Sequence, residues 1–158
     1  MPLCNPAELK PLLAAGARLL GLDVGTKTIG MALSDSTHII ASPLDTIRRT
    51  RFRDDLKRML DEIVRRQVGG IVIGLPLALD GNDSPRTQGV RQFAKNLMMH
   101  TPLPVAFWDE RLSTAAVERG MIAADLSRRR RAELIDKAAA AYILQGLLDH
   151  LNHRPRTI

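Results

Sequence analysis

One stretch of the sequence ends an apolar run on a carboxylate, and this feature constrains the fold more than any other. The run from Leu19 to Leu22 is interrupted only by Gly21, stops at Asp23, and is followed by a Gly-Thr-Lys-Thr turn and a second apolar run. Such a pattern predicts two buried strands joined by a tight turn. A buried, ionised carboxylate is costly unless a cation or several donors compensate it. Asp23 is therefore a candidate for chemistry, or else a turn former whose carboxylate accepts hydrogen bonds from the amides of residues 25–28.

Two further segments place acids in comparable positions. The apolar run 105–108 leads directly into Asp109 and Glu110. Asp136 lies on the apolar stripe of a predicted helix, because the residues at helical spacing from it are Ala139, Ala140, Ile143 and Leu147. Small alanines let a helix approach a sheet closely, so acids from two strand ends and one helix face could meet at one point.

Each of these acids also has a structural alternative. Asp109 or Glu110 could pair with Arg111, or cap the helix that the sequence predicts from residue 113. Asp136 could pair with a neighbouring basic side chain. Taken singly, the two acids after the strand are better explained in these ways.

The order of the predicted elements indicates an α/β fold with a mixed five-stranded sheet flanked by helices. Strands are predicted over 18–23, 28–34, 39–42, 71–75 and 105–108. A first long helix is predicted to begin at residue 52 and to end at Gly69 and Gly70, and further helices are predicted over 84–100, 113–124 and 132–151. The early strands should pair antiparallel and the strands reached through helices should pair parallel. Residues 18–151 form the predicted domain, preceded by an arm or short helix in 1–17 and followed by a frayed tail in 152–158.

Composition narrows the classes of function. The net charge is +6, hydrophobic residues make up 45% of the chain, and the single cysteine excludes an internal disulfide or a cysteine-based zinc site. No apolar run approaches the roughly 20 residues that span a bilayer, so we expect a cytoplasmic protein without a membrane partner. A basic chain with clustered acids suggests a polyanionic substrate held over a metal site; the alternative is a merely basic soluble protein.

The chain resembles the YqgF family of Holliday-junction-resolvase-like proteins, which have a ribonuclease H-like fold and are named as pre-16S ribosomal RNA nucleases. The matching motifs occur in family order over roughly residues 18–150, which is the part of the chain that the resemblance covers. They are the segments 21–30, 72–76, 80–81, 108–114 and 136–139.

The resemblance implies a metal-dependent nuclease that hydrolyses phosphodiester bonds, with processing of the 5′ end of pre-16S ribosomal RNA as the expected activity. By motif position, Asp23, Glu110 and Asp136 would be the catalytic, metal-binding acids, with Asp109 as an alternative to Glu110. The family's metal would be Mg²⁺ or Mn²⁺. The residues agree with this, because hard divalent cations prefer oxygen ligands and two such ions can promote an in-line displacement.

Basic residues are predicted to contact nucleic acid near these acids. The predicted contacts are Lys27, Arg111 and the run Arg128, Arg129, Arg130 and Arg131. Lys27 could instead be a solvated turn residue, and the arginine run, placed between two predicted helices, an ordinary exposed loop. A second basic patch comprises Arg48, Arg49, Arg51 and Arg53. Aromatic residues make up only 3% of the chain, which favours recognition of the phosphate backbone over base stacking.

Three other functions remain open on the sequence. The first is a Holliday-junction resolvase, which would need two active sites and therefore a homo-oligomer. The second is a nucleic-acid-binding factor in transcription or ribosome assembly that does not cleave. The third is a nucleotide-binding module, because residues 23–26 also resemble the phosphate loop of actin-like ATPases and sugar kinases; a single chain of 158 residues lacks their second lobe.

Overall fold

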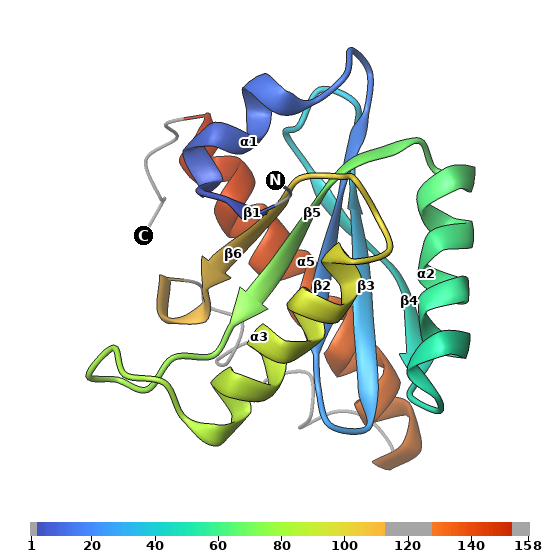
Figure 1. Ribbon diagram of the computed structural model, residues 1–158, viewed down its shortest axis with the longest axis vertical. Helices are drawn as coiled ribbons and strands as arrows, with labels where there is room; N and C mark the ends of the chain where they lie inside the picture. The colour runs from blue at the N-terminus through green and yellow to red at the C-terminus, as the bar shows by residue number, and fades with distance from the viewer. Residues whose placement is uncertain (1–2, 113–127, 153–158) are drawn as a thin grey trace.

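The computed structural model describes the backbone of residues 3–112 and 128–152, and the side chains of 3–112 and 137–152. Along the chain the elements are β1 (Leu3–Cys4), α1 (Pro6–Leu12), β2 (Arg18–Val24), β3 (Thr28–Ser34), β4 (Ala41–Arg48), α2 (Phe52–Arg65), β5 (Val68–Leu75), α3 (Pro85–Met98), β6 (Val105–Asp109), the 3₁₀ turn η1 (Glu110–Leu112) and α5 (Arg128–Leu151) (Figure 1). None of the helices in this described part is long and apolar enough to cross a membrane. The helix predicted over 113–124 lies outside the described residues.

The strands form one mixed sheet in the order β1-β6-β5-β2-β3-β4. The β2–β3 and β3–β4 pairs are antiparallel, whereas β2–β5, β5–β6 and β1–β6 are parallel. The predicted α/β class and mixed sheet are confirmed, but the strand count of five is wrong by one. The sixth strand is β1, and two residues are too few to produce a recognisable hydrophobic period.

Helices cover both faces of the sheet: α2 and α3 lie on one face and α5 lies on the other (Figure 1). Side chains of β2 alternate between these layers, as the pleat of a strand requires. Leu20 and Leu22 belong to the core beneath α2 and α3, whereas Leu19 packs with Ile143 and Leu144 of α5. Strand β2 is thus buried from both sides, which explains its nearly continuous apolar sequence.

Helix α5 lies directly on the backbone of β2 and β5, because each strand has a glycine beneath it. A Cβ atom on Gly21 would lie 2.9 Å from Cβ of Leu144 and 3.2 Å from the carbonyl oxygen of Ala140. A Cβ atom on Gly74 would lie 2.5 Å from Cδ1 of Ile143. The two glycines therefore set the distance between helix and sheet, and they position every residue of α5 relative to the strand ends.

Gly69 and Gly70 do not stop the first long helix, as the sequence had suggested, but lie inside β5. Helix α2 ends at Arg65, and Gln67 makes the turn with a positive φ of 57°. The glycines are required by packing, because a Cβ atom on Gly69 would lie 2.6 Å from Cβ of Ala17.

Two other predicted boundaries also differ from the structure. The strand predicted over 39–42 is β4, Ala41–Arg48, which lies at the edge of the sheet and has one buried residue, Ile47, among its eight. An edge strand needs few apolar residues, so its extent is poorly marked in the sequence. Helix α5 begins at Arg128 rather than at residue 132, so the arginine run forms the first turn of the helix and not a loop before it.

The segment before β2 packs into the fold through Leu9 of α1, which is fully buried in the core beside α5. We expect Leu9→Ala to lower the free energy of unfolding by about 2–5 kcal/mol, because the truncation leaves a cavity. The matched control is Leu12→Ala on the same helix: Leu12 is 56% exposed, so its loss should cost about 0.5 kcal/mol or less. Urea titration measures both values, and equal values would contradict a structural role for α1.

Candidate active site

Asp23 lies near the end of β2, where it pairs with Gly30 of β3 and is only 4% exposed. Gly21 faces α5, and residues two positions apart in a strand share a face, so Asp23 is on the α5 side of the sheet. The turn beyond it is closed by a hydrogen bond from the Gly25 amide to the Thr28 carbonyl. The guanidinium of Arg49 donates a second bond, 2.7 Å long, to the Gly25 carbonyl. Asp23 is thus held at a rigid strand end.

Glu110 follows β6 in η1, and its carboxylate lies against the neighbouring strand β5. Its Oε1 atom is buried and lies 3.2 Å from the position that a Cβ atom on Gly74 would take. Gly74 directly follows Ile73, whose partner across β2 and β5 is Leu22, the residue before Asp23. Adjacent strands are about 4.8 Å apart. The structure therefore brings Asp23 and the Glu110 carboxylate to the same end of the central strands and to the same face of the sheet.

The backbone of α5 carries Asp136 four residues before Ala140, whose carbonyl lies over Gly21. Four residues of helix correspond to a rise of about 6 Å. The first turns of α5 lie at the end of the sheet where the β2–β3 turn is found (Figure 1). Among the side chains that the structure describes, no group of three or more His, Cys, Asp or Glu could hold a metal ion. The Asp136 side chain is outside that set, so its role as a third ligand stays a prediction.

Asp109, the predicted alternative to Glu110, forms an ion pair with Arg111. The guanidinium of Arg111 donates to both carboxylate oxygens, with Nε 3.0 Å from Oδ1 and Nη2 2.7 Å from Oδ2, and its Nη1 also donates to the Leu79 carbonyl. These hydrogen bonds from Arg111 lower the pKa of Asp109. Arg111 therefore connects the end of β6 to the loop before α3.

The lowered pKa makes the Asp109–Arg111 pair a pH-dependent contribution to stability. The pair contributes above the pKa of an unfolded aspartate, about 3.9, and its contribution is lost as the pH falls through the lower folded value. We expect Asp109→Asn to lower the Tm at pH 7, and the difference from wild type to shrink below about pH 4. Thermal melts across this range, with exposed Asp61→Asn on α2 as the control, test it. A constant difference at every pH would contradict the assignment.

Sequence reasoning gave no role to Arg86, yet its Nη2 atom lies 3.8 Å from Oδ1 of Asp23. Arg86 is near the start of α3, where Ser84 and Thr87 form a reciprocal capping box. The Thr87 hydroxyl also donates to the carbonyl of Pro76, which directly follows β5. The recognisable feature in the sequence was a capped helix start after a buried strand, because that arrangement returns the chain to the strand's carboxyl end.

The other predicted nucleic-acid contacts are placed as follows. Lys27 is exposed in the β2–β3 turn, close in sequence to Asp23. Within the second basic patch, Arg49 supports that turn and its guanidinium lies 5.6 Å from the centre of the Phe93 ring. The arginine run begins α5, and its side chains are outside the described set.

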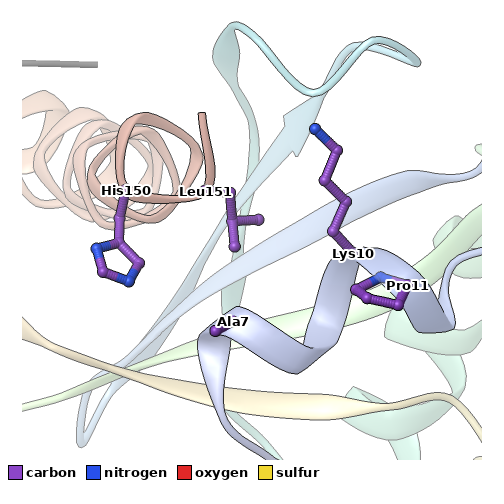
Figure 2. Close-up of a pocket in the computed structure, with 5 residues that line it drawn as sticks. All are labelled: Ala7, Lys10, Pro11, His150 and Leu151. Atoms are coloured by element: carbon purple, nitrogen blue, oxygen red, sulfur yellow. The ribbon is translucent and has the colours of Figure 1, made fainter. Parts of the chain in front are cut away.

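One apolar hollow near a helix end lies away from these acids. It has a volume of about 360 Å³ between α1 and the last turn of α5 and is lined by Ala7, Lys10, Pro11, His150 and Leu151 (Figure 2). Among the residues that the structure describes, none in its lining carries a carboxylate. It therefore belongs to the junction between the N-terminal helix and α5 and not to the candidate active site.

A comparison with protein-family models matches residues 17–150 to the family described as "RuvX: Holliday junction resolvase". The chain belongs to the RuvX family. This confirms the resemblance to YqgF, which is the same family. The matched residues include every strand of the sheet except β1, and all of the predicted catalytic acids.

Curated relatives agree with this membership. A protein of Paramagnetospirillum magneticum is 57% identical over 150 residues, which are 95% of this RuvX chain and 97% of the relative. A protein of Zymomonas mobilis is 62% identical over 132 residues, which are 84% of this chain and 80% of the relative. Both carry the name "Putative pre-16S rRNA nuclease". The RuvX chain is accordingly a nuclease, an enzyme that hydrolyses phosphodiester bonds.

A solved structure supports the fold. Thermus thermophilus RuvC, determined with a Holliday junction substrate, superimposes with a TM-score of 0.55 over 87% of this chain and 95% of RuvC. Only 12% of the aligned residues are identical, so this likeness concerns the fold alone. It confirms the predicted ribonuclease H-like architecture of the RuvX chain.

Proposed function

We propose that this RuvX chain is a divalent-metal-dependent nuclease that processes the 5′ end of pre-16S ribosomal RNA, with Asp23, Glu110 and Asp136 as its metal ligands. The observation that carries the proposal is the convergence of Asp23 and Glu110 at the ends of the central strands, on the face covered by α5. The names of the relatives supply the substrate.

The two acids that the structure describes have the chemistry that a hard divalent cation requires. Asp23 is buried, and so is Oε1 of Glu110. Carboxylates brought close together at low exposure repel one another and are stabilised by a bound cation. Carboxylate oxygens favour Mg²⁺ or Mn²⁺ over softer metals. Asp23 and Glu110 would hold and orient such ions from the strand ends, and the ions would supply activation of the attacking water and stabilisation of the leaving oxygen.

A four-way DNA junction is the second candidate substrate. The description of the matching family favours it, since that family is named for Holliday junction resolution. A resolvase cuts two strands, so this activity would require two copies of the chain, each contributing one site.

The test incubates the purified chain with a pre-16S RNA fragment, a four-way DNA junction and linear controls of each, with Mg²⁺ or Mn²⁺. We expect cleavage of the RNA fragment that stops when EDTA removes the metal. Cleavage confined to the junction would support the second candidate. Binding of RNA without metal-dependent cleavage of any substrate would overturn the proposal and favour a non-catalytic factor.

The arginine run at the start of α5 provides a test of substrate binding. Replacing Arg128–Arg131 with serine should weaken binding to all nucleic-acid sequences alike, because phosphate contacts carry no sequence information. For every phosphate that the run neutralises, the substitution should reduce the slope of log K against log salt by about 0.9 for duplex DNA and about 0.7 for single strands. Filter binding at several salt concentrations measures the slope. An unchanged slope would show that the run is only a solvated helix end.

A further inference from the structure

Arg86 is placed where it can act on both the buried acid and the substrate. Its guanidinium is 3.8 Å from the carboxylate of Asp23, whose side chain is 5% exposed, whereas the side chain of Arg86 is 46% exposed. A buried carboxylate therefore has beside it a cation that is half in solvent. Burial makes the compensation of the Asp23 charge necessary, and the exposure of Arg86 leaves its guanidinium accessible to a ligand from outside.

The pair is loose in comparison with neighbouring arginines. A separation of 3.8 Å is longer than the 2.7–3.2 Å of a hydrogen bond to nitrogen, so the attraction is electrostatic only. Arg91, on the same helix, donates two hydrogen bonds to Asp83, with Nε 2.8 Å from Oδ2, and Arg111 lies 2.7 Å from Asp109. Unlike these two arginines, Arg86 can leave its carboxylate without breaking a hydrogen bond to it.

The backbone of Arg86 is held in place by the start of α3, whereas its side chain makes no hydrogen bond to Asp23. The capping box of Ser84 and Thr87 orders the first turn of α3, and the bond from Thr87 to the Pro76 carbonyl holds that turn against the end of β5. The amino end of a helix carries a partial positive charge. A phosphate that approaches Asp23 would meet this helix end as well as the guanidinium.

We propose that Arg86 alternates between two partners: it compensates Asp23 in the metal-free protein and turns to the substrate phosphate when a divalent cation takes its place. With its charge neutralised by a bound cation, Asp23 would no longer attract the guanidinium, which the backbone of α3 would still hold near the site. A non-bridging phosphate oxygen next to the cleaved bond is then its acceptor. This inference rests on the proposed function, because it requires Asp23 to bind metal.

The first measurement is metal affinity without nucleic acid, by titration of Mn²⁺ into the full chain. Arg86→Ala removes a positive charge that competes with the metal, so we expect the variant to bind Mn²⁺ about three- to tenfold more tightly than wild type. Arg86→Lys keeps the charge and should stay near wild type. Arg91→Ala is the matched control on the same helix and should leave the affinity unchanged. A merely structural role for Arg86 predicts unchanged or weaker metal binding in Arg86→Ala.

The second measurement is binding of the pre-16S RNA fragment, with Ca²⁺ in place of Mg²⁺ and the RNA checked for integrity afterwards. Arg86→Ala should bind more weakly, and its slope of log K against log salt should be smaller by about 0.7, the value for one neutralised phosphate of a single strand. Arg91→Ala should keep the wild-type slope. If Arg86→Ala does not fold, Arg86→Gln serves both measurements, since it removes the charge and keeps a polar side chain.

The outcomes separate this inference from the proposed function. A wild-type chain that binds neither Mn²⁺ nor Mg²⁺ would overturn the proposed function and this inference together. Wild-type metal binding with no gain of affinity in Arg86→Ala would overturn the exchange of partners alone. Tighter metal binding with an unchanged salt slope would also overturn it, because Arg86 would then not contact phosphate.

Discussion

Replacing Asp23 with asparagine should abolish nearly all cleavage by the chain and leave its fold intact. The substitution keeps the shape of the side chain but removes from a buried position a negative charge and an oxygen that we propose as a metal ligand. Metal ions stabilise the charge of a transition state by several kcal/mol, and each 1.36 kcal/mol is tenfold in rate. We therefore expect the cleavage rate to fall by about 10³-fold or more.

Single-turnover cleavage and thermal melting should be measured on the same preparations. Glu110→Gln should behave like Asp23→Asn, because both carboxylates lie at the same end of the central strands. Asp109→Asn serves as the comparison: its carboxylate is occupied by Arg111, so activity at pH 7 should be largely retained. Retention of full activity by a folded Asp23→Asn variant would remove Asp23 from the active site.

Gly74→Ala should damage both stability and activity through a single added carbon. The new Cβ atom would lie 2.5 Å from Cδ1 of Ile143 and 3.2 Å from Oε1 of Glu110. The first distance is too short for two carbons, so Ile143 or the whole of α5 must move. Overpacking of this kind costs about 1–3 kcal/mol. The second contact displaces a carboxylate that we assign to the active site, so cleavage should fall more than the stability loss explains.

The double variant Gly74→Ala/Ile143→Val separates these two effects. Valine lacks the Cδ1 atom that the new Cβ would strike, so the double variant should regain much of the lost unfolding free energy relative to Ile143→Val alone. Activity should recover less, because the contact with Glu110 remains. Urea titration and cleavage rates on all four proteins complete the cycle. Full recovery of activity together with stability would show that Glu110 was never displaced.

The sequence predicted best those elements whose character is local. Strands β2, β5 and β6 are buried apolar runs, and α5 has its apolar residues at helical spacing, so each could be recognised without knowledge of its neighbours. The predictions were wrong where the structure of a segment depends on contacts with residues far away in the sequence. Gly69 resembles a helix stop until Ala17 is known to pack against it, and β4 is an edge strand that needs little hydrophobicity.

The same distinction applies to the candidate site. Asp23 could be proposed because it directly follows apolar residues of a strand, and Glu110 because it follows the apolar residues of β6 after one intervening residue and matches the family motif. Arg86 could not, since its position beside Asp23 depends on how α3 returns to the end of β5 and on the pairing of β5 with β2. These are relations between residues far apart in the chain; the capped helix start is a local pattern, but it does not by itself place Arg86 beside Asp23.

The two edges of the sheet have a consequence for how copies of the chain could associate. An exposed strand edge offers unpaired amides and carbonyls to another chain. One edge is β1, only two residues long, and the other is β4, which carries Pro43 at an irregularity in its pairing with β3. A short strand and a proline both discourage continuation of a sheet. Two copies brought together on a branched substrate would therefore meet through helices or loops, and each sheet would remain closed to the other.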